Sequence, residues 1–173
     1  MYSHGTEVII IRDDPNVFGD GNHESTQMVL EALYNQNPTN KTVLDIGTGT
    51  GIQSIFATKW GAEEILAVDT NASCIYTARK NFQKNNVEVT SRLNIYNEFI
   101  EDKFDITIAN LPISNIIEYI PMAKNTMKDE GVLIFSWDKQ FGIFEAHLEE
   151  NEFEIAEHFE GIDWDAYVVE LKG

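Results

Sequence analysis

A glycine-rich run in the first third of the chain constrains its fold more than any other feature. Residues 43–51 read Val-Leu-Asp-Ile-Gly-Thr-Gly-Thr-Gly, so an apolar stretch passes directly into glycines at alternate positions. The apolar stretch predicts a buried strand, and the glycines permit a tight turn that brings backbone N–H groups close to a ligand. Asp69 follows a helix-length segment and a second apolar stretch, where an acid can accept ribose hydroxyls. This layout predicts a binding site for a nucleotide-containing cofactor.

The size and composition of the chain predict one globular domain. We expect residues 1–173 to share one core, with 1–24 as an N-terminal arm and a loop that covers the cofactor. No apolar run reaches the roughly 20 residues that span a bilayer, and the N-terminus lacks the residue order of a signal peptide. The single cysteine, Cys74, excludes an internal disulfide and fits a cytoplasmic protein. Cys74 falls in a predicted helix, where we expect it to pack.

The charge of the chain bears on its partners. It carries 29 acidic and 12 basic residues, for a formal net charge of −17. Such a surface repels phosphates on average, which argues against nucleic acid as a partner. The segment 140–171 is rich in Asp and Glu and contains no Lys or Arg. It is interpreted either as a solvated acidic face or as a surface that attracts a cationic partner.

Apolar periodicity predicts an alternating α/β chain. Residues 6–12 are expected to form a strand or an extended arm. Strands are predicted at 42–46, 64–68, 87–95, 104–109, 131–136, 153–159 and 166–171, and helices at 25–35, 51–60, 71–85, 113–127 and 139–150. The alternation implies a mostly parallel, seven-stranded sheet with helices on both faces. The short turn at 160–165 makes the last two strands a hairpin, so one of them must run antiparallel.

The terminal hairpin and the glycine spacing together point to one cofactor. A dinucleotide site prefers Gly-x-Gly-x-x-Gly, whereas this chain has Gly47-x-Gly49-x-Gly51. A doubly wound, Rossmann-like sheet that ends in an antiparallel hairpin resembles the class I methyltransferases, which bind S-adenosylmethionine. In that setting Asp45 can accept the methionine ammonium, and Asp69 the ribose hydroxyls. The alternative is that the glycines form only a structural turn between strand and helix.

A third motif follows the strand at 104–109. Asn110-Leu111-Pro112 places an amide side chain at the carboxyl edge of the predicted sheet, where ligands bind in open α/β folds. Methyl transfer requires the lone pair of the nucleophile to point at the methyl group. The Asn110 carbonyl and the following backbone carbonyl can hold an amine in that orientation. Asn110 could instead serve only to end the strand in a turn.

The loop at 14–26 completes a set of motifs that resembles the catalytic domain of the ribosomal protein L11 methyltransferase family. That family's D-P-G-x-A-F-G-T-G-x-H-x-T-T pattern is matched at Asp14, Pro15, Phe18, Gly19, Gly21, His23 and Thr26. The glycine run, Asp69 and residues 109–111 match its later blocks in order. The resemblance implies that Thr26, Gly47, Asp69 and Asn110 contact S-adenosylmethionine or frame its methyl group. We also assign Phe18, Gly19, Asp45, Thr48, Gly49 and Gly51 to the cofactor site and Asn110 to catalysis.

The chain also departs from that family. Family members carry a separate N-terminal domain that recruits the ribosomal protein, and this sequence begins close to the catalytic domain, which leaves the acceptor open. Where the family has Ser-Gly-Ile-Leu, this chain has Ser-Trp-Asp-Lys at 136–139. Trp137 and Asp138 suggest a reshaped pocket that receives a cation, or Trp137 packs against the following helix. His23 fits loop structure better than a general base, and no histidine has metal-ligand spacing, so no metal is proposed.

We therefore predict an S-adenosylmethionine-dependent N-methyltransferase. Its partner would be an amine-bearing peptide, protein or small metabolite, and a cationic acceptor would suit the acidic surface. Two alternatives stay open. One is a catalytically silent cofactor-binding module, and the other is an amino-methylating nucleic-acid enzyme that needs a basic partner subunit. No membrane association is expected, and the sequence leaves the oligomeric state open.

Overall fold

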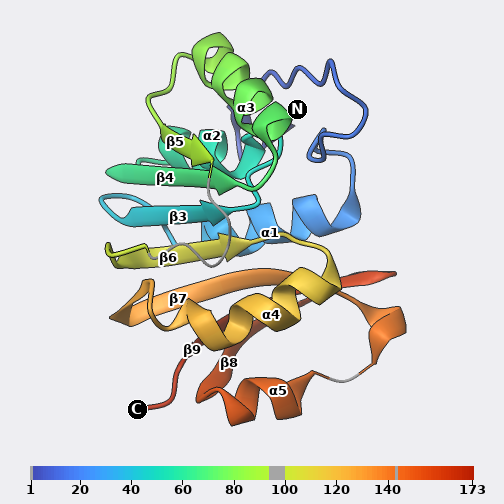
Figure 1. The fold of residues 1–173 in the computed structure, drawn as a ribbon, viewed down its shortest axis with the longest axis vertical. Helices are drawn as coiled ribbons and strands as arrows, with labels where there is room; N and C mark the ends of the chain where they lie inside the picture. The colour runs from blue at the N-terminus through green and yellow to red at the C-terminus, as the bar shows by residue number, and fades with distance from the viewer. Residues whose placement is uncertain (1, 94–99, 143) are drawn as a thin grey trace.

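The computed structural model describes residues 2–93, 100–142 and 144–173. A seven-stranded sheet with strand order β5-β4-β3-β6-β7-β9-β8 forms its centre (Figure 1). Its strands are β3 (Thr42–Ile46), β4 (Glu64–Asp69), β5 (Thr90–Leu93), β6 (Phe104–Ala109), β7 (Met127–Asp138), β8 (Phe153–Glu160) and β9 (Trp164–Leu171). The helices are α1 (Glu24–Asn35), α2 (Ile52–Lys59), α3 (Ala72–Asn85), α4 (Ile113–Ala123) and α5 (Glu145–Glu150). Strands β3 to β7 pair in parallel, whereas β9 is antiparallel to both of its neighbours, which confirms the predicted fold class.

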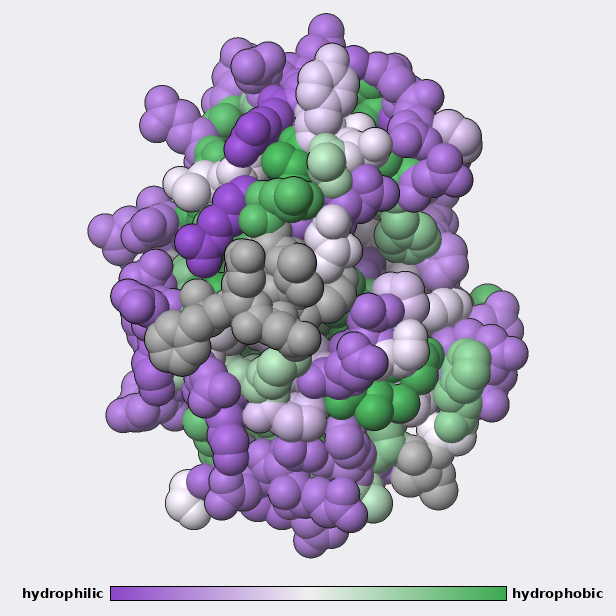
Figure 2. Space-filling model, in the orientation of Figure 1, coloured by the Kyte–Doolittle hydropathy of each residue, from purple (hydrophilic) through white to green (hydrophobic). Residues whose placement is uncertain are grey.

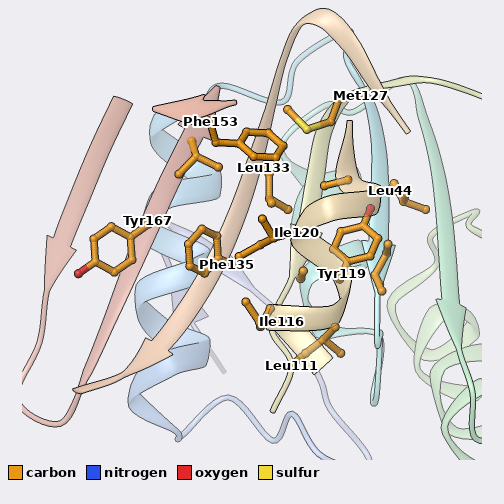
Figure 3. Close-up of a cluster of buried hydrophobic side chains, with 14 of the residues drawn as sticks. Leu44, Leu111, Ile116, Tyr119, Ile120, Met127, Leu133, Phe135, Phe153 and Tyr167 are labelled. Carbon is orange, nitrogen blue, oxygen red and sulfur yellow. The ribbon is translucent and has the colours of Figure 1, made fainter. Parts of the chain in front are cut away.

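Two apolar layers hold the helices against the sheet, because side chains alternate between its faces. Leu133 and Phe135 of β7 face α4 and α5, and Val132 and Ile134 face the helices on the other side. Figure 3 shows the first layer, in which Ile120 of α4 lies close to the β7 side chains. In the second layer, α1, α2 and α3 cover the opposite face.

The register of the parallel strands brings the three chemical motifs together. Ile46, the last residue of β3, pairs with Val68 of β4 on one side and with Ala109 of β6 on the other. The carboxyl ends of these strands therefore point to the same edge of the sheet (Figure 1). Consequently the glycine turn, Asp69 and Asn110 lie at one edge, as expected for ligand sites of open α/β sheets.

Some element boundaries differ from the sequence prediction. The helix expected to reach residue 127 ends at Ala123, because Thr126 turns back on it through N–H and hydroxyl bonds to the Ala123 carbonyl. Strand β7 can therefore begin at Met127. The helix expected at 139–150 is a 3-10 turn, η1 (Lys139–Phe141), followed by the shorter α5, and Gly142 with φ of +73° separates them. The strand expected at 87–95 is β5, and residues 94 and 95 lie outside the described part of the chain.

The N-terminal arm lies along α3 instead of joining the large sheet. A short hairpin of β1 (Tyr2–Ser3) and β2 (Thr6–Glu7) comes first. The backbone of Ile9 then exchanges hydrogen bonds with the Asn85 side chain, and that of Ile11 with the Asn81 side chain. Asparagines one helical turn apart thus replace a neighbouring strand, and the extended arm of the sequence prediction is confirmed beyond residue 7.

The described residues on one face of the molecule are mainly hydrophilic. Figure 2 shows hydrophilic residues over most of one face, with smaller groups of hydrophobic residues between them. Among these residues the structure holds no helix both long and apolar enough to cross a bilayer.

Candidate functional site

The glycine turn connects β3 to α2 in a conformation that needs its glycines. Gly47, Gly49 and Gly51 have φ values of +70°, +55° and +83°, in the region that L side chains rarely adopt. A Cβ atom on Gly49 would lie 2.5 Å from the carbonyl oxygen of Phe18. The N–H groups of Gly47 and Thr48 both donate to the Val68 carbonyl, at 2.9 and 3.0 Å. The turn is therefore fixed between β4 and the upstream loop.

Asp45 is buried next to the glycine turn and is hydrogen-bonded to it. Its side chain is 1% exposed, and Oδ2 accepts hydrogen bonds from the hydroxyls of Thr48 at 2.7 Å and Ser54 at 2.6 Å. Burial raises the pKa of Asp45 from 3.8 to about 6, against the opposing effect of these two hydroxyls. The bonds tie the end of β3 to the turn and to the first turn of α2.

Asp69 lies at the end of β4 and braces the other side of the turn. It is 7% exposed, and its Oδ2 accepts a hydrogen bond from the Gly49 N–H at 3.0 Å. Its Oδ1 accepts from the Asn71 N–H at 2.9 Å. Each carboxylate oxygen has two lone-pair sites, so both oxygens can still accept a ligand hydroxyl.

The upstream loop is bonded directly to the glycine turn. The Thr50 N–H donates to the Phe18 carbonyl at 3.0 Å, and the Thr50 hydroxyl donates to the Gly19 carbonyl. Asn81 of α3, fully buried, donates to the Thr50 carbonyl at 2.9 Å as well as to the N-terminal arm. The arm, the loop and the turn thus form one bonded unit, which no local sequence pattern shows.

A cavity of about 440 Å³ opens at this edge of the sheet. Its described lining is Asn16, Phe18, His23, Ser25, Gly47, Gly49, Asp69, Asn71, Cys74, Asn110, Leu111, Pro112 and Trp164. Of the predicted site residues, this lining contains Phe18, Gly47, Gly49, Asp69 and Asn110. The other predicted residues that the structure describes, namely Gly19, Thr26, Asp45, Thr48 and Gly51, are outside the lining. Cys74, predicted to pack in a helix, does lie in α3 and is buried at the cavity wall.

The Asn110 amide is held at both ends. Its Oδ1 accepts a hydrogen bond from the Ser136 hydroxyl at 2.8 Å, and its Nδ2 donates to the Thr26 hydroxyl oxygen at 3.4 Å. Ser136 and Thr26 are fully buried, so water does not compete for the hydrogen bonds between their hydroxyls and the Asn110 amide. The bond to Ser136 leaves one lone pair of the Asn110 carbonyl, which can accept a proton-bearing group in the cavity.

Sequence reasoning placed Phe18 in the site but missed Trp164, which completes the aromatic wall of the cavity. His23 is the N-cap of α1, and its Nδ1 lies 2.8 Å from the Ser25 hydroxyl, in keeping with the predicted role in loop structure. Its ring meets those of Phe18 and Trp164 edge to face, each at 5.2 Å between centroids. Trp164 begins β9, far from every motif, so no local signal placed it here.

The unusual segment at 136–139 proves to be mainly structural. Trp137 is 5% exposed, packs 4.7 Å from the Phe144 ring and donates its indole N–H to the Gly142 carbonyl, so the packing interpretation is confirmed. Asp138 caps η1 and lines a separate pocket, which borders the cavity at Pro112 and Trp164. Within the described ranges, no group of three or more acidic, His or Cys side chains is arranged to hold a metal ion.

Comparison with known proteins gives consistent matches. The family described as "Ribosomal protein L11 methyltransferase (PrmA)" matches residues 1–172. A protein of that name from Caldicellulosiruptor saccharolyticus is 40% identical over 150 residues, which is 86% of this chain and 48% of the relative. Another from Dictyoglomus turgidum is 36% identical over 159 residues, 90% of this chain and 53% of the relative. This chain thus spans about half the length of these relatives.

Solved structures agree with this match. The crystal structure of a ribosomal protein L11 methylase from Lactobacillus delbrueckii subsp. bulgaricus superposes with a TM-score of 0.85 at 29% identity, covering 92% of this chain and 84% of that one. A Thermus thermophilus 16S rRNA methyltransferase, solved with AdoMet and guanosine, gives 0.76 at 20% identity and covers 92% of this chain and 46% of that one. The second likeness concerns the fold alone.

Proposed function

We propose that this chain, which belongs to the ribosomal protein L11 methyltransferase family, transfers a methyl group from S-adenosylmethionine to an amine of a protein. The single observation that carries the proposal is the position of Asn110 in the cavity that also contains the glycine turn and Asp69. A cofactor site and a group that can orient an amine therefore share one space.

The chain's residues fit that cofactor. Gly47 and Gly49 bring backbone to the cavity surface, and the Asp69 carboxylate suits ribose hydroxyls. Leu111 and Pro112 add apolar wall, which suits a cofactor without phosphates. We assign the hydroxyl contacts to Asp69 and the backbone contacts to the glycine turn. We assign Asp45 to holding the glycine turn and not to contacting the cofactor, because its Oδ2 already accepts hydrogen bonds from two hydroxyls of the protein itself.

The acceptor side depends on the Asn110 carbonyl. S-adenosylmethionine supplies a methyl group on a positively charged sulfur, and an attacking amine must present its lone pair to that methyl. An amine N–H directed at Asn110 Oδ1 would leave the lone pair free to face the cofactor. Ser136 and Thr26 fix the plane of the amide beforehand, so no rotation is needed when the acceptor binds. The amine becomes cationic on transfer, and the acidic surroundings stabilise that charge.

Ribosomal protein L11 is the acceptor we propose, at a lysine or terminal amine. The relatives carry its name, and a net charge of −17 favours a basic protein over nucleic acid. We also propose a cytoplasmic location, where ribosomes are available.

The test is to incubate the protein with isotopically labelled S-adenosylmethionine and either purified bacterial L11 or the peptides, metabolites and RNA of a bacterial extract, and to locate label by mass spectrometry. We expect label on an amine of L11, and labelling about 100-fold slower when the Asn110→Ala variant is used. Cofactor binding without label on L11, peptides or metabolites would contradict the proposal and favour a silent binding module. Label on RNA in place of protein would favour the nucleic-acid alternative.

A further inference from the structure

Glu24, the first residue of α1, binds a segment almost at the other end of the chain. Its Oε1 accepts a hydrogen bond from the Ile162 N–H at 2.5 Å. Its Oε2 accepts from the N–H groups of Asp163 at 3.0 Å and Trp164 at 3.1 Å. One carboxylate therefore satisfies three consecutive backbone donors of the turn between β8 and β9. Charge-assisted bonds of this kind are among the stronger protein hydrogen bonds.

The same turn is tied from its opposite side by Lys139 of η1. Its Nζ donates to the Gly161 carbonyl at 2.7 Å and lies 3.2 Å from Asp165 Oδ1. The hydrogen bond from the Ile162 N–H is the main cause that lowers the pKa of Glu24 below its usual value, and the carboxylate is ionised at neutral pH. Both anchors are therefore charged under ordinary conditions, and the turn is held between them.

What this turn positions is a wall of the cavity. Trp164 follows it directly and lines both the cavity and the separate pocket that borders it at Pro112. The Ile162 side chain at the tip of the turn is 86% exposed, so its packing adds little to hold the turn in place. A carboxylate that holds the Trp164 backbone thus also fixes the distance between the indole and the Asn110 to Pro112 segment.

We propose that Glu24 is a positioning residue for the acceptor side of the site, acting through the turn at 161–164. The proposal rests on the proposed methyl transfer only for its effect on catalysis. Loss of the carboxylate should loosen the turn and widen the space beside Asn110. The glycine turn and Asp69 have no bond to Glu24, so cofactor binding should remain.

The test compares Glu24→Gln with Glu154→Gln, a matched loss of one charge at an exposed position of β8. A glutamine keeps the size but directs an amide NH₂ at backbone donors. We expect amide hydrogen exchange at residues 162–164 to rise about tenfold in Glu24→Gln and to stay unchanged in Glu154→Gln. In assays with purified L11, we expect its KM to rise about fivefold or more, with the kcat and the S-adenosylmethionine Kd within about twofold.

The two readouts separate the possible failures. Unchanged exchange at 162–164 in Glu24→Gln would overturn the anchoring role, whether or not methyl transfer occurs. Faster exchange with an unchanged KM for L11 would overturn the positioning role. A parallel loss of cofactor affinity would overturn it too, because it would show a general structural defect. If the wild-type protein does not methylate L11, the proposed acceptor fails, and the exchange result still decides whether Glu24 holds the turn.

Discussion

The two halves of the cavity, one proposed to bind the cofactor and the other the acceptor, are built in different ways. The cofactor half consists of the glycine turn and Asp69, which lie at the carboxyl ends of adjacent parallel strands and are joined by the hydrogen bond from the Gly49 N–H to the Asp69 carboxylate. The acceptor half draws on the start of α1, the end of β6 and the start of β9. Local sequence therefore specifies the first half, whereas the second half exists only once distant segments have packed. Substitutions should consequently separate cofactor affinity from turnover.

The largest effect is expected at Gly49. Alanine there would combine a positive φ with a Cβ only 2.5 Å from the Phe18 carbonyl, so the turn or the loop must move. We expect Gly49→Ala to abolish measurable S-adenosylmethionine binding by calorimetry. Gly142→Ala is the matched control, because Gly142 also has a positive φ but nothing within 4 Å of an added Cβ. It should cost about 1–3 kcal/mol of stability and leave cofactor affinity intact. Equal losses in the two variants would show that the close approach to Phe18 is unimportant.

The next effect tests the acceptor half. Asn110→Ala removes the carbonyl that faces the cavity, and we expect kcat to fall by about 100-fold while the cofactor Kd changes by about twofold or less. Single-turnover kinetics and calorimetry measure the two quantities. A parallel loss of both would place Asn110 in the cofactor half and break the division between them. Unimpaired turnover would remove it from the site.

Substitution of Asp45 tests whether its carboxylate acts by stabilising the glycine turn. The pKa of Asp45 is about 6 in the folded protein and 3.8 for an unperturbed aspartate, so the folded state binds the proton more tightly than the unfolded state. Its contribution to stability is thus greatest below pH 3.8 and declines as the pH rises to about 6. Between pH 4 and pH 7 the wild type should lose on the order of 2 kcal/mol of unfolding free energy through Asp45. Asp45→Asn lacks this titrating group and should not show that loss.

Denaturant unfolding at both pH values measures this difference. Asp129→Asn, at an exposed position of β7, controls for the loss of one charge and should show the same loss as the wild type. The same pH profile for both variants would indicate that the Asp45 carboxylate is not buried as described. A large loss of cofactor affinity in Asp45→Asn, with the fold intact, would favour direct contact with the methionine ammonium.

The smallest effect is expected at Asp69. Asp69→Asn keeps one acceptor oxygen for the turn or the ligand, and we expect the S-adenosylmethionine Kd to rise about tenfold, with a smaller change in kcat. Titration calorimetry at constant pH measures the change. An unchanged Kd would remove the ribose assignment, and a loss confined to kcat would contradict the division of the cavity into two halves.

Much of the cofactor half could be predicted from short sequence patterns. Residues 43–51 carry both the strand signal and the glycines, and β3 and β6 lie at the predicted residues. Predictions failed where a single hydrogen bond or backbone angle decides an element's end. Thr126 ends α4 early through its bond to Ala123, and Gly142 divides the expected helix at 139–150. Propensity averaged over a window does not resolve such single-residue effects.

The sequence by itself determined the fold class, the family and the edge of the sheet at which the motifs meet. It could do so because apolar periodicity and glycine spacing are local, and parallel strands place their carboxyl ends together. Only the tertiary structure decided that Asp45 lies beneath the turn, that Ser136 and Thr26 hold Asn110, and that Trp164 completes the cavity. The contacts of Asn110 and Trp164 join residues far apart in the chain, and their partners are selected by packing and register, which no single segment encodes.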